Sequence, residues 1–225
     1  QDPSALVVGM AFDSAANLLI AAAIRSDSAE QSAWVQLTLI DSKNLATLAR
    51  FDLPKETGVE SGFRPAGTYF YMDENNRIVI GTKDRTVWLV SYSYDSSTGR
   101  WLFHHDNEAH PWDLSASIPD GDSIQALQPD WSGRLWFTSK GGVVGTLDMA
   151  TGEVIGSMQL QKSEERPEER IVNGHAAGEE GGVYIASTRA MYRFDADPDG
   201  RPKVTWRKTY KAGHHVKPGQ VDLGT

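Results

Sequence analysis

Short apolar runs recur along the chain, and each of them follows a polar turn. The first residues of these runs, 17, 77, 134 and 182, lie 60, 57 and 48 positions apart. A period of this size is typical of repeat proteins, in which each unit buries its apolar faces only against its neighbours. The aligned runs cover residues 17–21, 77–81, 134–138 and 182–186.

Each repeat is predicted to contain four short strands. Val, Ile, Tyr, Trp and Phe dominate the strand-like runs, and Gly, Asp, Asn and Ser separate them. Tandem four-stranded units with almost no helix signal predict an all-β fold, a β-propeller made of four-stranded antiparallel blades. We expect about four blades, over residues 5–55, 63–118, 122–162 and 171–212.

Residues 213–225 resemble a loop that enters a further blade, so residues 1–225 are expected to form a portion of a single larger propeller. An incomplete ring would leave apolar blade faces and strand edges uncovered. We therefore expect a partner chain or a homo-oligomer to complete the ring, and closure by four blades is the alternative. The charged stretch 161–170 contains Pro167 and no apolar stripe, which predicts an exposed loop.

The third predicted strand of every repeat ends on an aspartate. These residues are Asp41, Asp95, Asp148 and Asp195. An aspartate at the first position of a turn accepts backbone N–H bonds, and a later Gly supplies positive φ. All four are therefore predicted to be hairpin residues rather than catalytic ones.

Composition excludes several classes of protein. The 225 residues include no cysteine, which rules out a disulfide scaffold and thiol catalysis. A net charge of −8 argues against general binding of nucleic acid or anionic membranes, and no apolar run approaches the ~20 residues of a membrane span. The sequence starts at Gln1 rather than Met, which leads us to expect an exported protein, secreted or periplasmic, whose signal has been removed.

Residues 130–139, 182–187 and 191–195 resemble a broad group of bacterial propellers. This group includes the streptogramin-lyase and gluconolactonase-like families and the quinoprotein-like repeat proteins. The resemblance implies the fold more than an activity, because propellers host many functions. Enzymes of the group use carboxylate, Asn or His clusters at the central channel, usually with a divalent metal, and no such cluster can be matched here. The signature of quinone-dependent dehydrogenases is not recognisable either.

The innermost strand of each blade lines the channel of a propeller, and the loops entering it surround the ligand-binding mouth. His175 in that position could act as a general base or metal ligand, and Asn173 could orient a substrate. Alternatively, both residues satisfy hydrogen bonds in a wet channel. The residues predicted for these positions are Arg64, Asp122, Gln125, Asn173, His175 and His214.

Two segments have the composition of metal sites. Asp195, Asp197 and Asp199, followed by Gly200, have the alternate spacing that opens a calcium loop. The bidentate Glu expected at its twelfth position is replaced by Trp206, so a plain Asp-rich hairpin is the alternative. The stretch 104–110 contains three His and could bind zinc or nickel, although adjacent His104 and His105 would point to opposite faces of a strand.

Two functions remain open from the sequence. The first is a binding or scaffolding propeller, with a small-molecule or protein ligand and a ring completed by further blades or a partner chain. The second is a lactonase- or lyase-like enzyme with Ca²⁺ or another divalent metal in the channel. Whether the protein is an enzyme is left undecided by the residues.

Overall fold

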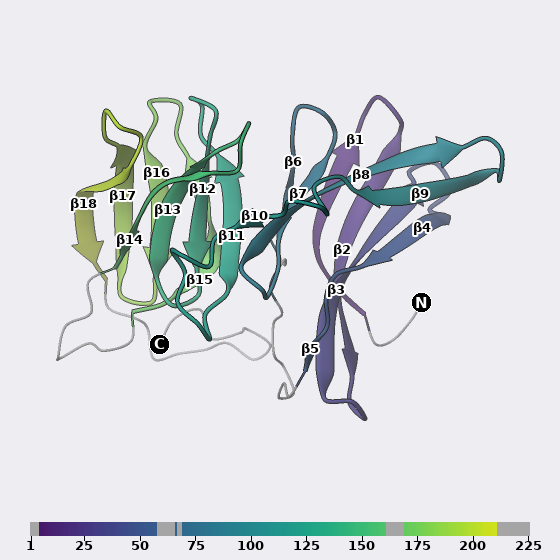
Figure 1. Ribbon diagram of the computed structural model, residues 1–225, viewed down its shortest axis with the longest axis horizontal. Coiled ribbons are helices and arrows are strands. Elements are labelled where there is room, and N and C mark those ends of the chain that lie inside the picture. Colours follow the sequence, from purple (N-terminus) through teal and green to yellow (C-terminus); the bar gives the residue numbers. More distant parts are fainter. Residues whose placement is uncertain (1–4, 58–65, 67–68, 161–168, 211–225) are drawn as a thin grey trace. The chain divides into compact units, whose positions relative to one another are not determined.

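The computed structural model describes residues 5–57, 66, 69–160 and 169–210, and these ranges contain strands and turns but no helix (Figure 1). The prediction of an all-β fold is therefore confirmed. No helix in the described part of the chain is long and apolar enough to cross a membrane. The chain divides into two compact units, Gln1–Trp112 and Asp113–Thr225, and each of them is described by itself.

The first unit contains two antiparallel sheets, called sheets A and B. Sheet A has the order β1 (Leu6–Asp13), β2 (Leu18–Asp27), β3 (Ser32–Asp41) and β4 (Thr47–Asp52), and β5 (Glu56–Thr57) also pairs with β3. Sheet B has the order β6 (Tyr71–Met72), β7 (Ile78–Gly81) and β8 (Thr86–Asp95), and β8 pairs in addition with β9 (Arg100–His105) and β10 (Trp112–Asp113).

The second unit contains sheets C and D, each with its four strands in sequence order. Sheet C consists of β11 (Ile124–Pro129), β12 (Arg134–Ser139), β13 (Val143–Asp148) and β14 (Val154–Gln159). Sheet D consists of β15 (Ile171–Ala177), β16 (Val183–Ser187), β17 (Ala190–Ala196) and β18 (Pro202–Thr209). Four successive antiparallel sheets of this kind are the blades of a β-propeller, about four of them.

Apolar side chains from facing sheets form the core of each unit. In the first unit, Ile20 and Leu37 of sheet A pack in one cluster with Ile78 of sheet B. In the second unit, Trp136 of sheet C packs in one cluster with Phe194 of sheet D. All five are fully buried. The aligned apolar runs therefore lie on strands that are covered by a neighbouring sheet, as the repeat pattern predicts.

A turn aspartate precedes the second strand in three of the four sheets. Asp130 shows the arrangement: its Oδ1 accepts bonds from the backbone N–H of Ser132 (2.8 Å) and of Arg134 (3.1 Å). Its Oδ2 accepts bonds from Arg134 Nε and Trp136 Nε1, both at 2.9 Å. Burial raises the pKa of Asp130, but these hydrogen bonds outweigh burial and the net shift is downward. Asp13 and Asp73 hold their turns in the same way.

The predicted hairpin role is confirmed for three of the four later aspartates. Asp41, Asp95 and Asp148 each accept a bond from the backbone N–H two residues later, at 2.8–2.9 Å. The prediction is wrong for Asp195, because β17 continues past it and Asp195 pairs in register with Lys203. Asp197 takes the turn role instead, with bonds from the N–H groups of Asp199 and Arg201.

Candidate functional site

The first strands of sheets C and D, β11 and β15, lie against each other within the second unit. Gln125 on β11 is almost fully buried and its Nε2 donates a 2.9 Å hydrogen bond to the carbonyl of Val172 on β15. Gln125 was predicted for a loop at the mouth of the channel. In the structure its amide is a cross-link between two sheets.

His175 also lies on β15, opposite Ile185 of β16. Directly opposed residues of an antiparallel pair share one face of the sheet. Ile185 is fully buried in the cluster that contains Trp136 and Val144 of sheet C. The imidazole of His175 therefore lies on the face of sheet D that packs against sheet C. Asn173, two residues earlier, is half-buried.

Both ring nitrogens of His175 are inaccessible to solvent and neither makes a hydrogen bond of normal geometry. Burial lowers the pKa of His175 to about 4, and the nearby backbone of Gln128 opposes this shift only in part. The imidazole is therefore neutral at pH 7. A general base needs both access to the substrate and a partner that orients its ring, and His175 has neither in this arrangement.

Asp122 locks a turn. Its Oδ1 accepts hydrogen bonds from the backbone N–H groups of Ser123 (2.7 Å) and Gly141 (2.8 Å), which ties the segment before β11 to the turn between β12 and β13. Its Oδ2 is buried and has no partner. A Cβ at position 141 would lie 2.5 Å from that oxygen, which explains the glycine there. The other two predicted residues, Arg64 and His214, lie outside the described residues.

The three aspartates of the predicted calcium loop are engaged separately. Asp195 accepts bonds from the Arg193 guanidinium at 3.1–3.3 Å and from the Thr205 hydroxyl. Asp197 holds its turn through backbone bonds, and the exposed Asp199 lies 4.0 Å from Arg201. Among the residues that the structure describes, no group of three or more His, Cys, Asp or Glu side chains could hold a metal ion. We assign no metal to this loop.

The side chains of the histidine-rich stretch 104–110, which begins at the end of β9, likewise do not converge on one point. His105 stacks on Trp88, with 3.9 Å between the ring centroids, while His104 bonds the hydroxyl of Ser93 at 2.8 Å. Their register partners, Val90 and Ser91, are adjacent on β8, so the two imidazoles occupy opposite faces as expected. The amide of Asn107 bonds the backbone of β8 at Val87 and Leu89.

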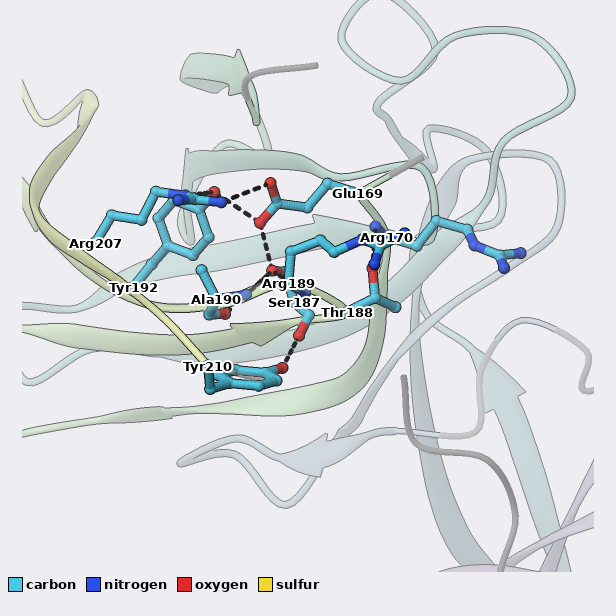
Figure 2. Close-up of polar contacts among 9 residues, drawn as sticks. All are labelled: Glu169, Arg170, Ser187, Thr188, Arg189, Ala190, Tyr192, Arg207 and Tyr210. Atoms are coloured by element: carbon cyan, nitrogen blue, oxygen red, sulfur yellow. Dashed lines mark hydrogen bonds and ion pairs between the residues drawn. The ribbon is translucent and has the colours of Figure 1, made fainter. Parts of the chain in front are cut away.

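One buried polar cluster, at the end of sheet D, was not predicted from the sequence (Figure 2). The carboxylate of Glu169 is only 2% exposed as a side chain, although residues 161–170 were predicted to be an exposed loop. It accepts hydrogen bonds from the hydroxyls of Ser187 and Tyr192 and pairs with Arg207 Nη2 at 3.2 Å. Tyr210 donates to the carbonyl of Ser187. The prediction of an exposed loop is therefore wrong for Glu169.

The hydrogen bonds and the ion pair of this cluster hold parts of sheet D together. The Oγ of Ser187 accepts the backbone N–H of Ala190 at 2.9 Å, and Ser139 accepts that of Val143 at 2.9 Å in the equivalent turn of sheet C. A serine hydroxyl that accepts a backbone N–H of this turn is therefore a feature that sheets C and D share. The carboxylate of Glu169 is occupied by two hydroxyls and one guanidinium, which leaves it poorly suited to activate Ser187 as a nucleophile. The repeated hydroxyl could have been found from the sequence, but no local signal identifies Glu169.

Comparison of the chain with protein-family models and with curated proteins found no match. The all-β blade organisation is therefore the part of the expected resemblance that the structure supports.

Proposed function

We propose that the protein is a binding and scaffolding module of the β-propeller type, which receives a further β-sheet on the free face of sheet A. The observation that carries this proposal is the exposure of large apolar side chains on β1. Val7, Met10 and Phe12 are 53%, 68% and 54% exposed. Large exposed apolar patches on folded proteins mark interaction sites.

The pairing of β1 with β2 and of β2 with β3 defines this face. Phe12, Met10 and Val7 lie opposite Leu19, Ala21 and Ala23. Ile40 on β3 lies opposite Leu19 and belongs to the same face. The outer face of sheet A is defined by seven residues: Val7, Met10, Phe12, Leu19, Ala21, Ala23 and Ile40. The alternate residues of the same strands, such as Ile20 and Leu37, point the other way and pack against sheet B.

The outer face of sheet A has the make-up of a sheet-packing surface. These seven residues are uncharged, and the small side chains of Ala21 and Ala23 allow a second sheet to approach closely. The register also places Arg25, two residues after Ala23, and Arg50, opposite Thr38, on this side of the sheet, so its margin is charged. Towards β4 the same face becomes polar: Gln36 and Trp34 both donate to Asp52, at 2.7 Å and 3.0 Å. An apolar centre with a polar rim is the usual anatomy of a protein interface.

We assign the occupant as a sheet from a second copy of the chain. Most soluble oligomers are homo-oligomers, and each unit of this chain already contains two sheets packed face to face. Covering a side chain of the size of Val7, Met10 or Phe12 stabilises an interface by roughly 1.5–3 kcal/mol each at full burial. Three such residues contribute several kcal/mol towards the roughly 4–15 kcal/mol that association costs, and the rest of the buried face has to supply the remainder.

The experiment is sedimentation equilibrium of the full chain and of two variants over a wide concentration range. Wild type is expected to associate, and Met10→Lys/Phe12→Lys is expected to be monomeric with an unchanged β-type circular dichroism spectrum. The control is Leu45→Lys, at a 71% exposed position in the turn between β3 and β4, which should associate like wild type. A monomeric wild type, or association that survives in the double variant, overturns the proposal.

A further inference from the structure

The imidazole of His175 lies at the contact between sheets C and D in mainly apolar surroundings, where the backbone of Gln128 favours its charged form only in part. Its neighbours on the shared face of sheet D are the fully buried Ile185 and then Tyr192, which is opposite Ile185 on β17. Across the contact lie Trp136 and Val144, also fully buried. Neither ring nitrogen makes a hydrogen bond of normal geometry, although the backbone of Gln128 is near enough to favour the charged form in part. Protonation would therefore place a positive charge in apolar surroundings.

The charged groups of sheet C near this contact have partners except for Asp122, before β11, whose Oδ2 is buried without one. On β12 and the turn before it, Arg134 Nε pairs with Asp130 Oδ2 at 2.9 Å. Asp148, opposite Arg134 on β13, is exposed and holds its own hairpin through the N–H groups of Ala150 and Thr151. The residues of β11 that contact β15 are the uncharged Gln125 and Gln128. On β14, Met158 packs against the core cluster and is also uncharged.

The charged groups of sheet D are paired in the same way. Glu169, just before β15, pairs with Arg207 on β18 at 3.2 Å, and the hydroxyl of Tyr192 bonds both of them. Arg201, in the hairpin between β17 and β18, lies 4.0 Å from the exposed Asp199. Strand β16 contributes only uncharged side chains to this face, among them Val183 and Ile185. Asp122 lies before the start of β11, whereas His175 lies near Gln128 at the other end of that strand, and no carboxylate contributes to the pKa shift of His175.

We propose that His175 makes the contact between sheets C and D sensitive to acid, so that protonation of its ring separates β15 from β11. The device is local to the second unit and does not depend on the proposed docking face of sheet A. The cross-link from Gln125 to Val172 spans the same two strands, so it is broken when they separate.

The sign of the effect follows from linkage. Burial lowers the pKa of His175 from 6.5 to about 4 in the closed arrangement, whereas an opened, solvated ring titrates near its ordinary value. The open form then binds more protons than the closed form between these two values. Stability of the contact is complete above pH 6.5 and is lost progressively as the pH falls towards 4. Between pH 7 and 4.5 the ratio of closed to open forms should fall on the order of 50-fold.

The first unit provides an internal comparison. His105 lies opposite the buried Val90, and its Nε2 is also buried without a partner. Desolvation lowers its pKa, but the carboxylates of Glu108 and Asp106 oppose this shift. The face of Trp88, stacked at 3.9 Å, can also stabilise a cation. A charged His105 is therefore compensated in part by carboxylates, although the net shift of its pKa is still downward, whereas no carboxylate opposes the shift of His175.

The test is amide hydrogen exchange of the full chain from pH 7 to 4.5, corrected for intrinsic exchange and read by mass spectrometry in peptides from β11 and β15. Protection in wild type should fall on the order of 50-fold, and His175→Leu should remove most of this fall. The control His104→Gln removes an imidazole that bonds Ser93 in the other unit and should behave as wild type. An equal fall in His175→Leu and wild type overturns the proposal.

A second measurement on wild type covers the case in which His175→Leu does not fold. With ¹³C-labelled histidine, the ring signals of the six His residues can be followed by NMR through the same pH range. The ring of His175 is expected to titrate well below pH 6, together with shifts of the β11 and β15 amides. An ordinary titration near 6.5, or a low one without amide shifts, refutes the acid-sensitive contact.

Discussion

The hydroxyl of Tyr92 on β8 donates a 2.7 Å hydrogen bond to Oδ2 of Asp13, at the end of β1, and so joins sheet B to sheet A. The other oxygen of Asp13 accepts the backbone N–H groups of Ala15 and Ala16, at 2.9 Å and 3.1 Å. One carboxylate thus shapes a turn and fastens two sheets. Burial raises the pKa of Tyr92, and the bond to Asp13 raises it further.

Tyr92→Phe should reduce the free energy of unfolding by about 1–2 kcal/mol, because Asp13 Oδ2 loses its partner in a half-buried site. Urea unfolding followed by circular dichroism measures the change. Tyr94→Phe, two residues along β8 at a 55% exposed position, is the matched control and should be neutral within about 0.5 kcal/mol. Equal effects of the two substitutions would show that the bond does not stabilise the fold.

Glu169→Gln should destabilise the second unit by about 2 kcal/mol, because the guanidinium of Arg207 loses its counter-ion in a partly shielded site. The loss should appear in thermal unfolding and as faster hydrogen exchange in β18. Glu179→Gln alters an exposed carboxylate in a neighbouring turn and serves as the control. A stability equal to that of wild type would mean that the cluster contributes no net stabilisation.

Gly145→Ala should be among the costliest small substitutions in sheet C. A Cβ at this position would overlap the ring of Phe137, which is fully buried on the neighbouring strand. Overpacking of a rigid core costs about 1–3 kcal/mol, measured as a lowered urea midpoint. The double substitution Gly145→Ala/Phe137→Leu should recover part of the loss relative to the two single changes added together. Strict additivity would argue against the steric cause.

Asp95 allows a prediction that concerns titration alone. Hydrogen bonds from the side chains of Ser97 and Thr98 lower its pKa to about 2, and the backbone N–H of Ser97 assists. Ser97→Ala should therefore raise the pKa of Asp95 towards its ordinary value of 3.8. Carboxyl ¹³C NMR during an acid titration measures this shift. Ser96→Ala, which changes the adjacent residue in the turn, should leave the pKa of Asp95 where it is in wild type.

Features that depend on a few neighbouring residues were predictable from the sequence. Strands, turns and the four repeats follow from apolar alternation and turn residues, because each is decided within about ten positions. The same holds for Asp41, Asp95 and Asp148. Asp195 departs from the rule because β17 and β18 pair for longer, up to Ala196 and Pro202, and strand length depends on pairing with the partner strand.

The candidate site was predictable only in part, because the orientation of its side chains depends on register. The pairing of β15 with β16 is irregular between Ile171 and His175, and a shift of one residue moves a side chain to the other face. The sequence therefore identifies His175 as unusual but not the surface on which it lies. Glu169 could not be foreseen at all, since its partners Tyr192 and Arg207 are 23 and 38 positions away.

The ion pair between Glu169 and Arg207 joins the segment that leads into the first strand of sheet D to the last strand of that sheet (Figure 2). A sheet held only by its ladder of backbone bonds can lose strands one by one from its outer edge. Here β18 cannot peel away without also exposing a carboxylate that sits at the opposite margin. Sheet D is thus expected to melt as one cooperative block, with no stable three-stranded remnant.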